Sequence, residues 1–131
     1  MDVVTDTSVI IAVITNADEK NRLIELTRDC GIIAPASVHW EVGNAFSSLL
    51  KRRQVTYLDV VEALEAYKDI PIRFVEVDLS AALQIASELS IYAYDAYLIA
   101  CAQQNGAPLL ALDRGLINAA RHLGVQVLEV A

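Results

Sequence analysis

The chain has 131 residues, a length typical of one domain, and 55% of them are hydrophobic whereas 21% are charged. This composition excludes an intrinsically disordered chain, and the size allows a core that needs no disulfide. Because 17 acids outnumber 10 bases, the formal net charge is −7, which excludes a protein that coats nucleic acid by bulk electrostatics. We therefore expect one domain over residues 1–131.

No apolar run reaches the ~18–20 residues of a membrane span, and no basic region followed by an apolar one marks a secretory signal. The two cysteines, Cys30 and Cys101, form no CxxC motif. We therefore expect reduced thiols in a cytoplasmic protein that has no membrane anchor.

Short apolar runs alternate with longer stretches that have helical spacing. In chain order we expect a strand over 3–5, helices over 8–14 and 18–28, a strand over 32–34, and helices over 38–53 and 56–68. A strand over 73–77, helices over 80–89 and 94–104, a strand over 109–112, a helix over 115–123 and a strand over 125–128 follow. Thr56 is the expected N-cap of its helix, and Gly106 and Gly124 are expected helix stops.

Nearly all-apolar strands separated by helices predict an α/β fold with a parallel sheet covered on both faces. In such sheets ligands bind beyond the carboxyl ends of the strands, so the residues that follow strands are the first functional candidates. Asp6 follows the first expected strand and Asp113 follows the fourth. Either residue alone is equally well explained as the cap of the next helix.

Asp95 is the one charge in the otherwise apolar run 91–102. A carboxylate that enters a buried helix is costly unless it is paired or binds a metal, and no basic residue lies nearby in the sequence. The alternative is an exposed first-turn acid, which the helix dipole favours.

Glu41 begins a polar stripe on the helix expected over 38–53. The stripe continues through Asn44, Ser48 and Arg52, whose spacing places them on one helical face. For Glu41 taken alone, a solvated polar face is the ordinary explanation.

The four acids together form a stronger pattern than any one of them. Oxygen-rich clusters without histidine suit Mg²⁺ or Mn²⁺. One or two such ions can activate a water and neutralise charge on a phosphate under attack. The pattern therefore indicates hydrolysis of a phosphodiester bond.

Four segments resemble the PIN-domain family, and within it the VapC-like toxin ribonucleases of toxin–antitoxin pairs: VTDTS at 4–8, Pro35 with EVGN at 41–44, YDAYLIA at 94–100 and LALD at 110–113. The resemblance covers nearly the whole chain, and it is the order and spacing of the segments that make it specific. It implies a three-layer α/β/α Rossmann-like fold with a parallel five-stranded sheet. It also implies an endoribonuclease that depends on Mg²⁺ or Mn²⁺ and cleaves RNA.

Carried over residue by residue, the resemblance makes Asp6, Glu41, Asp95 and Asp113 the catalytic, metal-binding quartet. Asp6 and Asp95 match the central ligands of a first metal ion. Glu41 matches a ligand or a residue that orients the attacking water, and Asp113 matches a further ligand, direct or through water.

Ser8 and Asn44 match polar positions beside that site, where they could steady a water or a phosphate.

The chain departs from the family pattern after its fourth strand. Ala111 stands where a threonine or serine is common, and Arg114 begins a stretch where another acid often occurs. Loss of that hydroxyl and that acid weakens a second metal site, which favours one ion or weak binding without substrate.

Lys51, Arg52 and Arg53 form the only basic cluster in the sequence, and Arg52 ends the stripe that Glu41 begins. An RNA backbone would lie at this cluster. The alternative is that it is a solvated helix C-terminus, which the helix dipole favours.

Three tyrosines lie near Asp95: Tyr92, Tyr94 and Tyr97. They could stack bases, although half-buried packing is the commoner role of such residues.

Other chemistries fit less well. His39 and His122 belong to no zinc pattern, and the chain has no Gly-rich phosphate loop. A receiver domain could use Asp78 as its third-strand acid, but residues 124–130 lack the lysine that it needs. Haloacid-dehalogenase-type phosphatases need Asp-x-Asp, whereas this chain has Asp6-Thr7-Ser8.

We predict an endoribonuclease that acts as the toxin of a type II toxin–antitoxin pair. The alternative is a PIN-like RNA- or protein-binding module without catalysis, which Ala111 keeps open. The resemblance implies a homodimer with a groove for the antitoxin's tail, and the apolar runs 9–14 and 40–46 suggest more apolar surface than one core requires. The RNA target and the cognate antitoxin are not encoded in these patterns.

Overall fold

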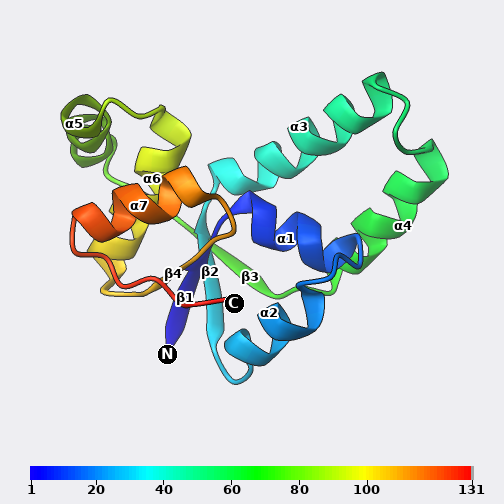
Figure 1. Cartoon of the computed structure of the whole chain (residues 1–131), viewed down its shortest axis with the longest axis horizontal. Helices are drawn as coiled ribbons and strands as arrows, with labels where there is room; N and C mark the ends of the chain where they lie inside the picture. Colours follow the sequence, from blue (N-terminus) through cyan, green and yellow to red (C-terminus); the bar gives the residue numbers. More distant parts are fainter. Residues whose placement is uncertain (131) are drawn as a thin grey trace.

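The computed structural model describes residues 1–130, so Ala131, the last residue of the expected domain, lies outside the described residues. Within that range the chain forms four strands and seven helices (Figure 1). The strands are β1 (Asp2–Thr5), β2 (Gly31–Pro35), β3 (Ile72–Val75) and β4 (Leu109–Leu110). The helices are α1 (Thr7–Ile14), α2 (Lys20–Thr27), α3 (Ser37–Lys51), α4 (Tyr57–Lys68), α5 (Leu79–Leu89), α6 (Ala93–Asn105) and α7 (Arg114–His122).

The strands form one parallel sheet in the order β3-β2-β1-β4. In the register of the sheet, Val4 of β1 lies opposite Ile33 of β2 and Leu109 of β4. Because β1 lies between β2 and β4 and all three are parallel, its carboxyl end lies between theirs. The expected α/β fold with a parallel sheet is confirmed.

The prediction of a fifth strand over 125–128 is wrong. Among the described residues, this segment forms no strand but a single parallel bridge from Val127 to Leu109. Two hydrogen bonds hold it there, from the Leu109 N–H to the Gln126 carbonyl and from the Leu128 N–H to the Leu109 carbonyl. The neighbouring β4 is itself only two residues long, so it offers too short an edge for a regular ladder.

Helices cover both faces of the sheet, with α1 to α4 on one side and α5 to α7 on the other (Figure 1). Successive side chains along a strand point to opposite faces of the sheet and enter different clusters. Val4 and Leu109 belong to the larger cluster of buried side chains, whereas their neighbours Val3 and Leu110 belong to a smaller one. The strands are therefore buried on both faces, as expected of a parallel sheet.

Local sequence accounts for where several helices begin and end. Thr56 caps α4 in a capping box with Asp59, because each side chain accepts the backbone N–H of the other residue. Gly106 ends α6 in the left-handed conformation, at φ 57°, which a residue without Cβ adopts at little cost. The pair α3 and α4 forms a hairpin that extends away from the sheet (Figure 1).

Two sequence expectations about the surface can be compared with the side chains. The apolar run 9–14 is packed into the core, with Val9, Ile10, Ala12 and Ile14 buried, so it supplies no surplus apolar surface. In α3, by contrast, Trp40 is 71% exposed. Across residues 1–130, no helix has the length and hydropathy of a membrane span.

The two cysteines are free within the described chain, as the sequence predicted. Cys101 is fully buried in α6, and burial raises the pKa of its thiol to about 11. It is therefore a core thiol that stays protonated rather than a nucleophile.

Candidate active site

The four predicted acids come from four elements that meet at the carboxyl edge of the sheet. Asp6 directly follows β1 and caps α1, and Asp113 follows β4 and caps α7. Glu41 lies in the second turn of α3, which follows β2, and Asp95 lies in the first turn of α6. Figure 1 shows these helices starting above the same end of the sheet. The fold thus brings together residues that are up to 107 positions apart in the sequence.

Asp6 is the most deeply buried of these acids, with 5% of its surface exposed. Its Oδ1 accepts the backbone N–H of Val9 at 3.1 Å, which caps α1. The hydroxyl of Ser8 lies 2.7 Å from both carboxylate oxygens and donates its single proton to them. Both hydrogen bonds hold the Asp6 side chain in a fixed orientation.

Ser8 also connects the ends of two strands. Its Oγ accepts the backbone N–H of Leu112 at 3.3 Å, across 104 positions of sequence. The hydroxyl therefore joins the residue that follows β1 to the segment that follows β4. In this structure Ser8 orients an acid, whereas the sequence only suggested that it lies beside the site.

Burial raises the pKa of Asp6 to about 6, against the lowering effect of the hydrogen bonds from Ser8 and Val9. The negative charges of Asp113 and Asp95 raise it further. This carboxyl is thus mostly ionised at pH 7 but takes up a proton as the pH falls through about 6, and its charge is coupled to those of two other acids.

Glu41 has an even more strongly perturbed pKa, which burial raises to about 7. The charges of Asp6 and Asp95 add to this rise, and the Thr7 hydroxyl opposes it. The Oε2 atom is buried and accepts no hydrogen bond from any described residue. A buried carboxylate oxygen without a partner is costly, so this atom is suited to a proton or a cation.

Asp95 and Asp113 complete the cluster at its outer side. Burial raises the pKa of Asp95, and the charge of Asp113 adds to the effect. Asp113 is exposed and accepts the N–H of Leu116 at 3.2 Å. Capping and clustering are therefore not exclusive, because Asp6 and Asp113 each cap a helix and also face other acids.

The donor set is composed of carboxylate oxygens, the ligands that Mg²⁺ and Mn²⁺ prefer. The unpartnered Glu41 Oε2 and the mutual repulsion of the acids also fit a bound cation. Within residues 1–130, however, no three Asp, Glu, His or Cys side chains stand close enough together to hold one ion. The acids lie at one edge of the sheet and their charges act on one another, but they do not converge on one point.

The polar stripe on α3 leads from the crevice to the tip of the hairpin. Asn44, Ser48 and Arg52 are exposed, on the face opposite the buried Val42 and Phe46. The helical rise puts Arg52 about 16 Å along the axis from Glu41.

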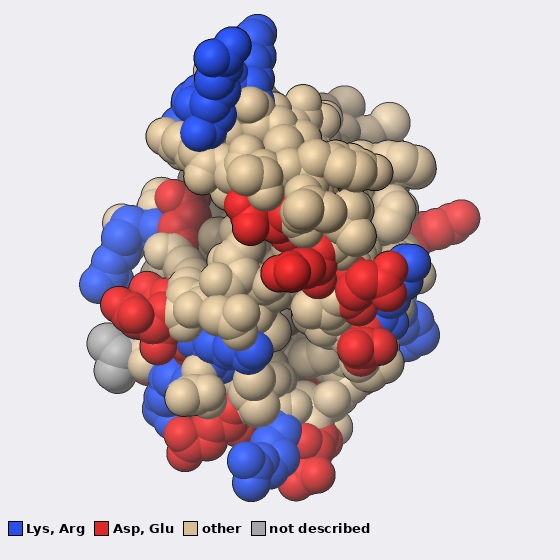
Figure 2. Space-filling view, turned by 90° about the vertical axis from the view of Figure 1, so that its right-hand side faces the viewer, with Lys and Arg blue, Asp and Glu red and all other residues tan. Residues whose placement is uncertain are grey.

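The basic cluster predicted at residues 51–53 is exposed at the end of α3. In Figure 2, which faces the α3–α4 hairpin, basic side chains project at the top, apart from the acids lower on this face. Arg52 thus lies on the same stripe of α3 as Glu41, about 16 Å farther along the helix axis, and does not touch the four acids.

Sequence reasoning missed two hydroxyl groups beside the acids. The Oγ of Ser37 and the Oγ1 of Thr7 are buried and form no hydrogen bond of regular geometry with the described residues, although the Thr7 hydroxyl lies close enough to Glu41 to lower the pKa of that carboxyl. Thr7 lies between Asp6 and Ser8 in the sequence, so its position in the DTS segment could have singled it out. Ser37 begins α3 one turn before Glu41, and the spacing of four residues is the signal that was available.

Residues 3–122 match the PIN domain family. The chain belongs to this family. No curated protein matches the sequence.

Solved structures share this PIN domain fold at low sequence identity. PAE2754 from Pyrobaculum aerophilum is 21% identical, with a TM-score of 0.69 over 91% of this chain and 87% of that one. VapBC2 from Rickettsia felis, bound to a DNA fragment from its promoter, is 16% identical, with a TM-score of 0.67 over 98% of both chains. The sarcin-ricin loop cleaving toxin VapC20 of Mycobacterium tuberculosis is 17% identical, with a TM-score of 0.62 over 89% of this chain and 94% of that one.

The raised pKa values predict how stability depends on pH when EDTA removes divalent ions. A carboxyl whose pKa is 3.8 in the unfolded chain and about 6 in the folded one stabilises the fold below pH 3.8. This stabilisation is lost as the pH rises through about 6, and for Asp6 it is on the order of 3 kcal/mol. We therefore expect the free energy of unfolding, measured in urea by circular dichroism, to fall between pH 4 and pH 7.

The Asp6→Asn variant should be more stable than the wild type above pH 6 and should show a flatter pH dependence. Its amide oxygen can still accept the Val9 N–H. The Asp18→Asn variant, which changes an exposed aspartate outside the crevice, is the matched control and should follow the wild type. If the free energy of unfolding falls equally steeply with pH in Asp6→Asn and in the wild type, Asp6 does not have the raised pKa described above.

Proposed function

We propose that this PIN domain is an endoribonuclease that depends on Mg²⁺ or Mn²⁺ and hydrolyses phosphodiester bonds in RNA. The observation that carries the proposal is the set of four carboxylates from four elements at the carboxyl edge of a parallel sheet. Burial raises the pKa values of Asp6, Glu41 and Asp95, and the charges of neighbouring acids in the set add to the rise. Raised pKa values in one crevice are typical of functional sites.

In this proposal Asp6, Glu41, Asp95 and Asp113 would hold one or two divalent ions. A bound ion would activate a water and neutralise charge on the phosphate that is attacked. Its positive charge would also offset the repulsion between Asp6 and its neighbours. The unpartnered Oε2 of Glu41 supports a role as a ligand or as the group that orients the water.

The protein's own groups prepare this site. The hydrogen bonds from Ser8 and Val9 fix the Asp6 carboxylate before any ligand binds. The N–H of Leu116 fixes Asp113 in the same way. Side chains oriented by hydrogen bonds need less reordering when they bind a ligand, which favours binding.

We favour one ion over two, with weak binding in the absence of substrate. Ala111 is fully buried and brings no hydroxyl to the end of β4, and Arg114 follows Asp113 where a further acid would support a second ion. A second ion would then depend on oxygens of the RNA itself.

RNA would leave the crevice along α3. Asn44 is exposed one turn after Glu41, where it could contact the phosphate next to the cut. Arg52, at the end of the same stripe, would contact a phosphate farther along the strand. Because the net charge is −7, the surface as a whole repels RNA. We therefore expect the phosphate contacts to concentrate at this basic tip.

We further propose that the protein is the toxin of a type II toxin–antitoxin pair. The similarity of its fold to VapBC2 and to the RNA-cleaving toxin VapC20 supports this role. An acidic crevice attracts a basic segment, so a basic stretch of an antitoxin would fit there.

We expect purified protein to cleave single-stranded RNA in Mn²⁺ or Mg²⁺ and to lose this activity in EDTA. The Asp6→Asn and Asp95→Asn variants should each lower the rate by orders of magnitude, because each loses a metal ligand. The Asp18→Asn variant should keep the wild-type rate. The measurement is gel analysis of a labelled RNA, paired with growth of cells that express each variant.

Equal rates for the wild type and both crevice variants would show that any cleavage comes from a contaminant. A wild type that binds RNA but never cleaves it would favour the alternative, a binding module without catalysis. Growth arrest by the wild type but not by Asp6→Asn is the result expected of a toxin.

Neutralising Arg52 tests the path of the RNA. The Arg52→Gln variant should bind single-stranded RNA more weakly and should reduce the slope of log affinity against log salt by about 0.7–1, because one phosphate contact is lost. Arg28→Gln, which removes an exposed arginine at the end of α2, is the matched control and should leave the slope unchanged. An unchanged slope in Arg52→Gln would exclude the proposed path.

We also propose a homodimer, which light scattering can test. Large apolar side chains remain exposed on α3 and α5, where Trp40 is 71%, Leu79 57% and Leu83 49% exposed. Burial of such side chains between two copies is favourable. The expected mass is twice 14.3 kDa at micromolar concentration, and a monomer mass at every concentration would refute the dimer.

A further inference from the structure

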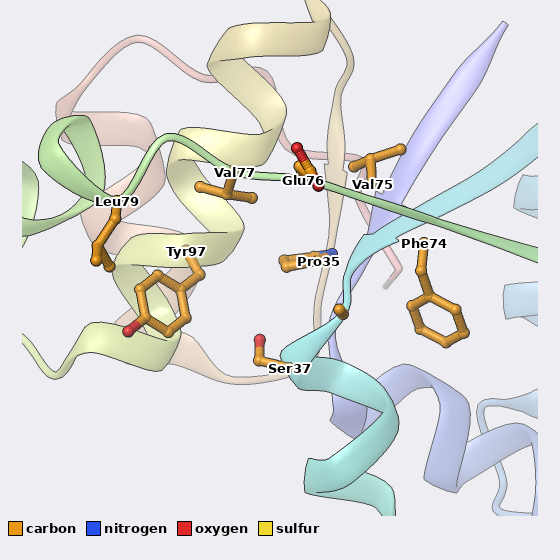
Figure 3. A pocket seen from close by; sticks show the side chains of 9 residues that line it. Pro35, Ser37, Phe74, Val75, Glu76, Val77, Leu79 and Tyr97 are labelled. Carbon is orange, nitrogen blue, oxygen red and sulfur yellow. The ribbon is translucent and has the colours of Figure 1, made fainter.

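A pocket of about 380 Å³ opens beside the acidic crevice, at the carboxyl ends of β2 and β3. Figure 3 shows the Tyr97 ring on one side of it, the Phe74 ring on the other, and the Ser37 hydroxyl between them. Pro35 and Val77 supply apolar lining from the two strand ends. The pocket is therefore built by β2, β3, α3 and α6, two of which also carry acids.

The pocket and the acids are connected through these two helices. Ser37 precedes Glu41 by four residues on α3, so the two side chains lie on one face with Cβ atoms about 5–6 Å apart. Helix α6 likewise contributes Asp95 to the acids and, from a different face, Tyr97 to the pocket. A nucleotide next to a phosphate held by the acids would therefore lie within reach of the pocket.

The residues that line the pocket favour an uncharged ligand over a phosphate group. Among the described residues that line the pocket, Glu76 alone is charged, so the pocket lacks a cation for a phosphate. Tyr97 is half-buried and packs edge to face with Tyr94 at 6.0 Å, which fixes the ring. The Ser37 Oγ is buried yet forms no hydrogen bond within residues 1–130, although a hydroxyl can both donate and accept.

A fixed aromatic ring, an apolar wall and one unsatisfied hydroxyl suit a neutral planar ring with polar edges. Nucleobases are such groups, and proteins bind unpaired bases of RNA by stacking them on aromatic side chains and hydrogen-bonding their edges. A volume of about 380 Å³ lies within the range of ligand pockets, roughly 300–1,000 Å³.

We propose that this pocket binds the base of the nucleotide adjacent to the cleaved phosphate, with Tyr97 as the stacking platform and Ser37 as the residue that reads the base edge. The inference rests on the proposed ribonuclease function, because it places RNA in the crevice. It assigns the base preference of cleavage to α3 and α6 rather than to the acids.

The first test measures binding without cleavage, in EDTA at low salt, by the fluorescence anisotropy of a labelled single-stranded RNA octamer. The Tyr97→Leu variant should bind about 5- to 150-fold more weakly, the loss expected when one stacked base is released. The Tyr97→Phe variant keeps the ring and should bind within about twofold of the wild type. Tyr57→Leu, which removes an exposed aromatic of α4 outside this pocket, is the matched control.

The second test maps cut sites in a random RNA pool with Mn²⁺ by sequencing the ends. The wild type should favour one or two bases beside the cut, and Ser37→Ala should weaken this preference while cleavage continues. Because the Ser37 hydroxyl has no partner in the described chain, Ser37→Ala should also unfold at the wild-type temperature or above it. Ser47→Ala, an exposed serine of the same helix, is the matched control.

The outcomes separate the two proposals. Equal RNA affinity for Tyr97→Leu and wild type would overturn the nucleobase assignment and leave the pocket to a protein partner. An unchanged cut-site preference in both Ser37→Ala and Tyr97→Leu would overturn it as well, with the ribonuclease function intact. If Tyr97→Leu weakens binding but the wild type never cleaves RNA, the pocket assignment stands and the ribonuclease function fails.

Discussion

Repulsion between carboxylates that share one edge of the sheet is the constraint on which the rest of the site depends. Asp6 cannot avoid this repulsion, because β1 lies inside the sheet and delivers the residue into a buried position between its neighbours. Burial is the largest cause of the raised pKa of Asp6, and it also weakens the screening by water, so the charges of Asp113 and Asp95 add to the rise. The fold thus holds negative charge at a cost in stability, as functional sites commonly do.

The surrounding structure moderates this cost without removing it. The Ser8 hydroxyl and the Val9 N–H both favour the ionised form of Asp6, and the start of α1 adds the positive end of its dipole. Glu41 receives less support, since its Oε2 accepts no hydrogen bond from residues 1–130. The site is therefore arranged so that a proton or a cation is the most favourable addition to it.

Much of this arrangement could be predicted from the sequence because it follows from local rules. Apolar runs define the strands, and Asp6 and Asp113 follow them directly, so the sheet topology brings both to one edge. The strand over 109–112 is shorter than predicted because the Leu112 N–H bonds the Ser8 hydroxyl instead of a neighbouring strand. Such a contact between distant residues has no signature in the local pattern. The buried hydroxyl of Ser37 was missed for the same reason, since its isolation depends on tertiary packing.

The bond between Ser8 and Leu112 also has a consequence for the order in which the molecule is completed during synthesis. Ser8 is made early in the synthesis of this domain, but its partner lies 104 positions later and Asp113 follows immediately after that partner. A nascent chain that lacks β4 can form α1, yet it cannot lock the end of β1 to the rest of the sheet or gather the four acids. The crevice can therefore assemble only once the ribosome has made nearly the whole domain.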